Sequence, residues 1–226
     1  MGLRLVDLSL DLFQGMPSYR VPDMYVWKWT SHEGTNELFG GRCSFESLAL
    51  MMSEHSSTHM DAPYHFDPDG PTIDRVPLER LALPGVVLDV RGKRPEEPIT
   101  AADLAAAHTQ AGSPDLRGKA LLLWTGWDEL WPTPQYNERP YLHFEAGEWI
   151  GQAGVTLLGL DIISIERPAD LDRPSHMTVL RKYGIPIVEA LASLGAVAGR
   201  EFTFLALPLK IRGGSGSPVR AVALLP

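Results

Sequence analysis

The stretch His55–Phe66 reads HSSTHMDAPYHF and carries more chemistry than any other part of this 226-residue sequence. It holds three of the chain's seven histidines, His55, His59 and His65, with Asp61 among them. Imidazole nitrogens and carboxylate oxygens are ligands that zinc and manganese accept. The cluster therefore predicts a divalent metal site, although a single histidine is more often a surface residue or a hydrogen-bonded core residue.

The spacing of these residues requires a bend in the chain. On a straight strand His55 and His59 would lie about 13 Å apart, too far for both nitrogens to reach one ion at about 2.0–2.1 Å. A turn across Ser56–Thr58 would bring both rings to one side. An extended run after the turn would then place His59, Asp61 and His65 on one face. For Asp61 the alternative is an Asp-Ala-Pro turn capped by its own carboxylate.

Composition excludes several classes of protein. The chain is 44% hydrophobic and 21% charged, and 20 Lys+Arg against 28 Asp+Glu give a net charge of −8. The apolar fraction argues against disorder, and no apolar run approaches the about 20 residues of a membrane span. Its charge makes the chain a poor nucleic-acid partner. Cys43 is the only cysteine, which excludes an intrachain disulfide, and the charged N-terminus does not resemble a signal peptide. We expect a cytoplasmic protein that acts on a small molecule or on another protein.

Short apolar runs and capping residues predict interleaved strands and helices. The expected strands are Val86–Val90, Ala120–Trp124, Val155–Leu160, Phe202–Ile211, Val219–Leu224 and Arg42–Met52. In the last of these the alternation holds at the start, at Cys43 and Phe45, and its phase slips near Ser47. The expected helices are Leu104–His108 capped by Thr100, Glu145–Gln152, His176–Tyr183 capped by Ser175, and Glu189–Leu194. This order indicates one α/β domain, residues 1–226, with a mixed sheet flanked by short helices.

Three further polar residues are candidates for the same site. His176 stands at the start of a predicted helix, and Glu189 follows the apolar run Gly184–Val188. Glu189 is equally consistent with a solvent-facing helix start and with a charge held at a strand end. Asp161 follows another apolar run and is equally consistent with a site residue and with the end of a strand.

At this point the sequence resembles the cyclase-like metal-dependent hydrolases, the family of bacterial kynurenine formamidase and isatin hydrolase. The signature of that family is His-x-Gly-Thr-His-x-Asp-x-Pro-x-His, and here it is HSSTHMDAPYH over residues 55–65. Further blocks resemble the family along almost the whole chain. They are Asp7–Ser9, Gly15–Tyr19, Ile73–Glu79, Leu121–Asp128, Gly184–Glu189, Leu207–Lys210 and Gly216–Arg220.

The resemblance implies a role for each matching residue. His55, His59 and Asp61 would bind the first divalent metal, Zn²⁺ or Mn²⁺. Asp61 would bridge to a second ion held also by His176 and Glu189. His65 would be the general acid and base, and Tyr19 would touch substrate, often from a neighbouring subunit. The family fold is a compact α/β domain, and its members are commonly homodimers or homotetramers.

Four positions depart from the family pattern. Ser57 replaces the usual glycine, so the bend lacks a residue that tolerates positive φ freely. The segment between His176 and Gly184 is one residue longer than the common pattern, Tyr19 stands where tryptophan is typical, and Glu166 stands where aspartate is common. Most of these changes surround the substrate, so the reaction class transfers better than the substrate.

The sequence therefore predicts a metal-dependent amidohydrolase that cleaves the carbon–nitrogen bond of an aryl formamide, amide or cyclic amide with His65 as general acid and base. Trp27, Trp29, Tyr19 and Phe66 could stack on a planar substrate, although most tryptophans in such a domain are core or interface residues. Two alternatives remain: a metal-dependent cyclase or dehydratase of polyketide type, and a non-catalytic metal-binding protein. Metal binding alone does not require His65, which argues against the last.

Overall fold

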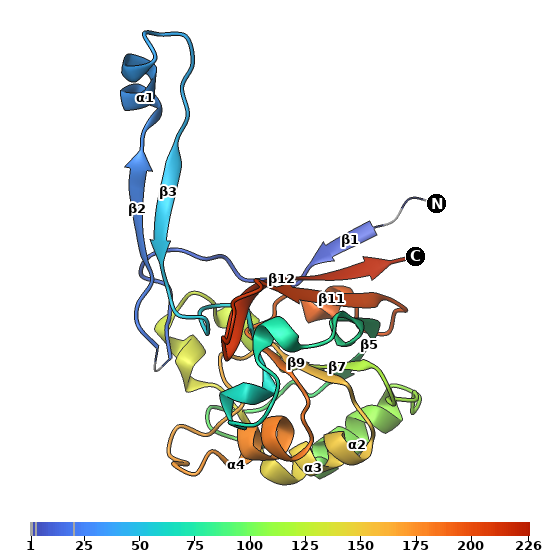
Figure 1. Ribbon diagram of the computed structural model, residues 1–226. Coiled ribbons are helices and arrows are strands. Elements are labelled where there is room, and N and C mark those ends of the chain that lie inside the picture. The colour runs from blue at the N-terminus through green and yellow to red at the C-terminus, as the bar shows by residue number, and fades with distance from the viewer. Residues whose placement is uncertain (1, 3, 20) are drawn as a thin grey trace.

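Eight strands form the central mixed sheet of the chain, and the computed structural model describes residues 2, 4–19 and 21–226 (Figure 1). Four neighbouring strands run parallel, and the remaining pairings are antiparallel. Across the sheet the order is β1 (Arg4–Asp7), β12 (Gly216–Leu225), β11 (Thr203–Pro208), β5 (Ala82–Asp89), β7 (Ala120–Trp124), β9 (Leu157–Leu160), β10 (Ile187–Glu189) and β4 (His59–Asp61).

The short strand β4 closes this sheet into a barrel-like ring. It pairs antiparallel with β10 on one side and with β12 on the other. In this register His59 lies opposite Glu189, and Asp61 lies opposite both Ile187 and Gly216. The closure brings the signature segment and the chain's last third together.

Helices cover the outer face of the parallel strands (Figure 1). They are α2 (Ala101–Gln110), α3 (Phe144–Gln152) and α4 (Pro174–His176), the last continuing directly into a π-helix, Met177–Lys182. One apolar cluster fills the space inside the closed sheet, and a second lies between the strands and the helices. Strand β7 alternates between them, with Leu122 in the first cluster and Leu121 and Leu123 in the second, as a strand buried on both faces requires.

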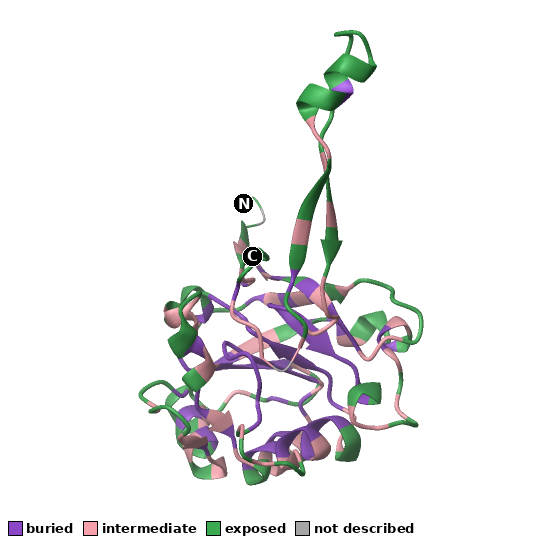
Figure 2. Cartoon of the chain, turned by 90° about the vertical axis from the view of Figure 1, so that its left-hand side faces the viewer, coloured by how far each residue is buried: buried purple, intermediate pink, exposed green. Residues whose placement is uncertain are grey.

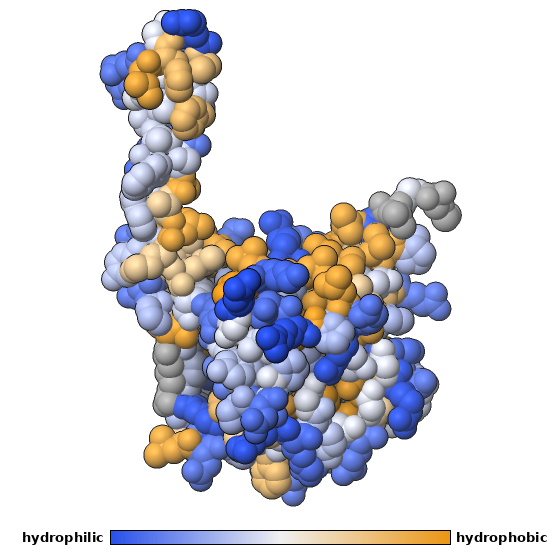
Figure 3. All heavy atoms as spheres, viewed as in Figure 1, coloured by the Kyte–Doolittle hydropathy of each residue, from blue (hydrophilic) through white to orange (hydrophobic). Residues whose placement is uncertain are grey.

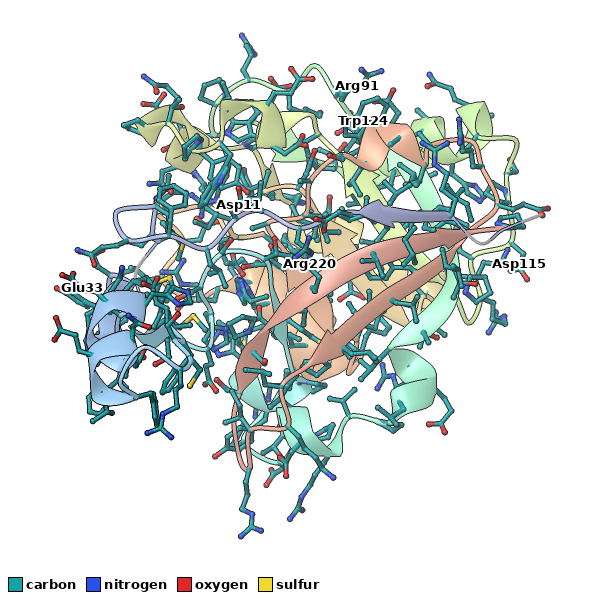
Figure 4. The ribbon with its side chains drawn as sticks, turned by 90° about the horizontal axis from the view of Figure 1, so that it is seen from above. Asp11, Glu33, Arg91, Asp115, Trp124 and Arg220 are labelled. Carbon is teal, nitrogen blue, oxygen red and sulfur yellow. The ribbon has the colours of Figure 1, made fainter. Side chains whose placement is uncertain are left out.

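At the end of β7, Arg91 lies over the ring of Trp124, with its guanidinium carbon 3.7 Å from the ring centroid (Figure 4).

Short elements complete the body of the molecule. A two-stranded sheet joins β6 (Pro98–Ile99) to β8 (Tyr141–Leu142). The 3₁₀ helices are Pro63–His65, Ile73–Arg75, Leu78–Arg80, Trp127–Leu130, Pro134–Glu138 and Leu194–Ala196.

A long arm projects from this body. It consists of β2 (Tyr25–Thr30), α1 (His32–Leu38) and β3 (Ser47–Met51), and its tip stands clear of every other element (Figures 1 and 2). Thr35 is the buried residue of α1, and its hydroxyl donates a hydrogen bond to the carbonyl oxygen of Phe45 at 2.7 Å. Both strands are mostly exposed, so the arm lacks an apolar core of its own.

Most expected elements of the core are confirmed, with the α/β class and the mixed sheet. Strand β7 spans the expected residues, and the other central strands differ from the expected bounds by a few residues. The helix after Thr100 begins with a capping box, in which the Thr100 hydroxyl accepts from the Asp103 amide and the Asp103 carboxylate accepts from the Thr100 amide. Within Arg42–Met52 only Ser47–Met51 is a strand.

Three expectations about local structure are wrong. Glu189–Leu194 is not a helix, because Glu189 ends β10 between β4 and β9. Ser175 does not cap a helix, since its hydroxyl donates to the carbonyl oxygen of Leu142 at 2.6 Å and the helix already begins at Pro174. The extended run after the bend ends at Asp61, and Pro63 starts a 3₁₀ turn that carries His65.

Candidate metal centre

A sharp bend at Ser57 shapes the centre of the signature segment. Ser57 adopts φ of 53°, in the left-handed region where the family pattern has glycine. The following residue anchors the bend, because the Thr58 hydroxyl donates to the carbonyl oxygen of Ala190 at 2.5 Å and accepts from the Leu10 amide at 2.8 Å. The bend brings the His55 and His59 ring centroids to 5.3 Å. The expected turn is therefore present, and it is made with serine.

Five side chains form two overlapping groups of potential metal ligands. His55, His59 and Asp61 form one, and Asp61, His176 and Glu189 form the other, with the ligand atoms of each group within 4.8 Å of one another. Asp61 Oδ1 lies 2.6 Å from His55 Nδ1 and 3.3 Å from His59 Nε2, while its Oδ2 lies 3.7 Å from His176 Nε2. Asp61 thus stands between the two groups.

Three of these histidines are oriented through the ring nitrogen that points away from the cluster. His59 Nδ1 donates to the carbonyl oxygen of Ser57 at 2.8 Å, which leaves Nε2 facing Asp61 and Glu189. His176 Nδ1 lies 3.1 Å from Glu166 Oε1, and this leaves its Nε2 facing Asp61 and Glu189. An outer hydrogen bond of this kind sets the tautomer and orientation of a metal-ligating histidine.

His55 is held by a longer chain of hydrogen bonds. Its Nε2 lies 2.9 Å from the hydroxyl oxygen of Ser215, and that hydroxyl donates in turn to the Glu54 carboxylate. Since Ser215 uses its proton on Glu54, its oxygen accepts from His55 Nε2, and Nδ1 faces Asp61 Oδ1 at 2.6 Å. The remaining potential ligand, Glu189, accepts at Oε1 from the Ile165 amide at 2.8 Å.

Buried opposite charges shift the pKa values of the cluster. Burial would raise the pKa of Asp61, but the charge of His59 and hydrogen bonds from His176, His55 and His59 hold it well below its usual value. Burial opposes a charged His59, yet Asp61 and Glu189 raise its pKa to about 9. Against the same burial, Asp61, Glu166 and Glu189 raise the pKa of His176 well above its ordinary value. The cluster therefore attracts positive charge into a buried site.

The donor set fits a divalent cation. Three imidazole nitrogens and two carboxylates converge in a space where most of the side chains are buried, and each imidazole presents the nitrogen that its outer hydrogen bond leaves free. Nitrogen and carboxylate ligands suit Zn²⁺, Mn²⁺ and related ions. A cation bound here would displace the protons that His59 and His176 hold.

His65 differs from the three oriented histidines. Its ring lies against that of His55, with centroids 4.1 Å apart and the planes tilted by 31°, and meets Phe66 edge-on at 4.8 Å. Within the described part of the chain, neither ring nitrogen of His65 has a hydrogen-bond partner. Burial by the surrounding protein lowers its pKa, an effect that Asp61 opposes and that His55 and His176 reinforce. His65 is therefore a neutral imidazole at neutral pH, with both nitrogens available.

A cavity of about 210 Å³ opens onto the cluster. Tyr19 and Phe66, both expected to touch substrate, lie in its wall, and Phe66 stacks on His176 with ring planes 14° apart and centroids 4.6 Å apart. Trp27 and Trp29 lie on the arm and not in this wall. The described lining consists of Tyr19, Val21, His55, His59, Asp61, His65, Phe66, Ile163, Ser164, Arg173, His176 and Glu189.

Gly216 on β12 gives the His55 ring the space it occupies. A Cβ at this position would lie 2.6 Å from His55 Cε1, 2.8 Å from the carbonyl oxygen of Met60 and 2.9 Å from His55 Nδ1. We expect Gly216→Ala to displace His55 and weaken metal binding about 10- to 100-fold, the range for a lost orienting contact. Calorimetric titration of the metal-free protein with Zn²⁺ measures this. The control is Gly34→Ala on α1, whose Cβ would meet only Ser31 Oγ at 3.4 Å. A folded Gly216→Ala variant with unchanged Zn²⁺ affinity would contradict the role of Gly216.

The structure brings together every residue expected at the metal site, and it adds four supporting residues to which the sequence analysis gave no role there. Glu54, Ser215 and Gly216 support His55, and Glu166 supports His176. Only one feature of the sequence could have pointed to Glu54, namely that it directly precedes the signature segment. Asp161 is a structural residue: its carboxylate accepts from the amides of Thr125 and Gly126 at 2.7–3.1 Å and from the Thr125 hydroxyl at 2.6 Å.

A π-helix follows His176, in the segment that the sequence analysis expects to be one residue longer than the family pattern. The Tyr183 amide donates to the carbonyl oxygen of Thr178, five residues back, at 3.2 Å. A π-helix holds one residue more than an α-helix over the same rise, and such segments occur frequently at functional sites. His176 can therefore face Asp61 and Glu189 although the segment is longer.

Fold and site together define an α/β protein with a buried His/Asp/Glu cluster suited to a divalent metal. A family model named Cyclase matches residues 6–167. Kynurenine formamidase from Paracidovorax citrulli is 31% identical over 98% of this chain and 97% of its own, and the enzyme of that name from Salinibacter ruber is 31% identical over 97% of each.

Solved structures agree with this relationship. Isatin hydrolase A from Ralstonia solanacearum superimposes with a TM-score of 0.87 at 25% identity, over 99% of this chain and 92% of its own. An isatin hydrolase bound to the product analogue thioisatinate shares the fold, with a TM-score of 0.84 at 22% identity over 99% and 93% of the two chains. The chain belongs to the Cyclase family of metal-dependent hydrolases.

Proposed function

We propose that this chain is a metal-dependent amidohydrolase that cleaves the carbon–nitrogen bond of an aryl formamide, an amide or a cyclic amide. Relatives named kynurenine formamidase and isatin hydrolase support the reaction class. One observation carries the proposal for this chain: three oriented histidines and two carboxylates converge beside a fourth histidine, His65, whose nitrogens are free among the described residues. A purely metal-storing site would not need that fourth ring.

The proposed ligands fall into two sets. His55, His59 and Asp61 would hold the first ion, and Asp61, His176 and Glu189 would hold a second. Zn²⁺ and Mn²⁺ are the proposed ions. Such an ion supplies Lewis acidity, which polarises a carbonyl and lowers the pKa of water.

The chain's own residues perform the proton transfers and hold the substrate. His65, neutral because burial lowers its pKa, accepts a proton from the attacking water and returns it to the departing nitrogen. Phe66, stacked on His176, offers a flat apolar wall for an aromatic ring, and Tyr19 lies in the same cavity wall. Ser215, Glu54 and Glu166 keep the imidazoles in orientation, so the ligands need no rearrangement during the reaction.

The test combines metal analysis with a substrate panel. Protein loaded with Zn²⁺ or Mn²⁺ is assayed on aryl formamides, isatin-type lactams and lactones in ¹⁸O-labelled water. Hydrolysis places the label in the formate or carboxylate product, whereas a cyclase or dehydratase need not incorporate it. Bound metal without turnover on any compound would instead support a metal-binding protein.

The exposed arm supports a homodimer as the working form. Figure 3 shows hydrophobic residues exposed on parts of the arm. The large apolar and aromatic side chains on the arm that are about half exposed or more include Trp27, Trp29, Leu38, Leu48 and Leu50. An isolated two-stranded hairpin is marginally stable in water, and an apolar surface of this extent needs a cover. A second copy of the chain, exchanging arms about a two-fold axis, would cover both arms at once.

Charges introduced on the arm should therefore dissociate the dimer. We expect the double variant Trp29→Glu/Leu48→Glu to shift the mass in light scattering from about twice 24.9 kDa to 24.9 kDa. The control is Leu78→Glu, which places the same charge on an exposed leucine of the body. A wild-type protein that is already monomeric, or a double variant that stays dimeric, would exclude this interface.

None of the helices that the structure describes has both the length and the apolar character that a membrane-spanning helix requires. Cys43, the single cysteine, is exposed and has no disulfide partner, as is usual in a reducing compartment. We propose that the enzyme acts on its small-molecule substrate in the cytoplasm.

A further inference from the structure

One side chain in the cavity wall carries a charge that the metal cluster does not use. Of the described residues lining the cavity, Asp61, Glu189 and the imidazoles belong to the proposed metal and proton chemistry, while Tyr19, Val21, Phe66, Ile163 and Ser164 are uncharged. The remaining lining residue is Arg173, a permanent cation.

Arg173 has no partner for this charge among the residues that the structure describes. Among the described residues no carboxylate lies within ion-pair distance of its guanidinium, and none accepts a hydrogen bond from it. Arginines that do have partners show what such a contact looks like in this chain. Arg91 and Arg220 pair with Asp89 and Asp7, and the buried Arg139 donates to the carbonyl oxygens of Ser164, Asn137 and Glu166.

The backbone of Arg173 is fixed in an unusual conformation. Its φ of 50° and ψ of 51° lie in the left-handed region, which costs a residue other than glycine free energy. Its carbonyl oxygen accepts from the Met177 amide at 3.0 Å, and Pro174 and the Ser175 hydroxyl bond to Leu142 fix the chain just after it. The turn therefore holds Arg173 at the cavity, three residues before the proposed ligand His176.

We propose that Arg173 binds a carboxylate of the substrate, so that the enzyme prefers an aryl formamide or amide that carries an anionic group. The inference rests on the proposed hydrolase function and specifies its substrate class. A guanidinium offers two parallel N–H donors to a carboxylate, and a charge-assisted pair of this kind is stronger than a neutral hydrogen bond. The aromatic part of the same substrate would lie against Phe66 and Ile163.

The experiment compares two substrates that differ in one charge. Formate release is measured from 2-formamidobenzoate and from its methyl ester, with protein whose metal content has been verified. We expect the ratio of kcat/KM for the acid over the ester to fall at least about tenfold in Arg173→Ala, and to be partly retained in Arg173→Lys. The matched control is Arg167→Ala, an exposed arginine outside the cavity wall, for which the ratio should stay within about twofold of wild type.

A binding measurement separates this inference from the proposed function. Calorimetry compares benzoate with benzamide on the metal-loaded wild type and on the same variants. If the wild type hydrolyses no formamide, amide or cyclic amide, the proposed function fails, but a loss of benzoate binding confined to the Arg173 variants still supports the anion site. Unchanged substrate ratio and benzoate affinity in Arg173→Ala, or an equal loss in Arg167→Ala, would overturn the inference.

Discussion

Asp61→Asn is expected to remove the bound divalent metal and to lower kcat/KM by at least about 10³-fold, more than the 10- to 100-fold typical of an orienting residue. Asp61 belongs to both groups of potential ligands, and its two oxygens face His55, His59 and His176 at 2.6, 3.3 and 3.7 Å. An asparagine keeps the shape but loses the charge, and a neutral amide oxygen is a much weaker partner for a divalent ion. One substitution should therefore damage both sites.

Metal content measured by mass spectrometry after dialysis against excess Zn²⁺ or Mn²⁺ tests this prediction, together with kcat/KM on the substrate found in the panel. The control is Asp69→Asn, which changes an exposed aspartate eight residues further along the chain. A thermal melt of each protein shows that the variant is folded. If Asp61→Asn retained a full complement of metal and its turnover, the assignment of the shared ligand would be wrong.

The parts of the fold that depend on local sequence were predictable. Strand β7 is apolar at four consecutive positions and buried on both faces, and Thr100 and Asp103 form a local capping box. Strand β10 was not predictable in the same way. Ile187–Glu189 is too short to show a hydrophobic periodicity. Its extended conformation is imposed by pairing with β9 and β4, which come from distant parts of the chain. Ring closure by β4 depends equally on long-range pairing.

The metal site likewise has one part that local sequence predicts and another part that long-range pairing decides. His55, His59, Asp61 and His65 lie within one segment, so their spacing alone indicated a common site. The residues that orient them come from elsewhere: Ser215 is 160 positions from His55. Serine and glycine in such places carry no chemical signal of their own, and their role depends on β12 lying beside β4. Long-range geometry therefore decides which ordinary residues support the site.

The bend itself shows how a departure from the pattern can be tolerated. Serine replaces glycine at position 57 and still adopts a positive φ of 53°, at a cost in free energy. The Thr58 hydroxyl accepts one hydrogen bond from Leu10 and donates another to Ala190, and these two bonds compensate for part of that cost. The longer segment after His176 is accommodated by the π-helix. In both cases the ligands still converge, so the departures change the supporting backbone and leave the cluster intact.

His65→Ala should separate metal binding from catalysis. We expect the variant to keep its metal and to lose at least about 10²-fold in kcat, the usual contribution of a general acid and base. The metal should remain because the groups that could hold it do not include His65, whose ring lies against that of His55 with centroids 4.1 Å apart. The rate should fall because, among the described lining residues, His65 is the one histidine outside both ligand groups.

The control for this variant is His108→Ala, since His108 Nε2 lies 2.8 Å from the carbonyl oxygen of Pro114 and belongs to helix α2, outside the cavity wall. Metal analysis and single-turnover kinetics on both variants distinguish the two roles, because a structural histidine would change stability without selectively slowing the chemical step. A His65→Ala enzyme that lost its metal would make His65 a ligand or a support for one. An enzyme with full metal and full turnover would show that the proton passes through another group, and the neutral, unpartnered imidazole beside the cluster would then need a different explanation.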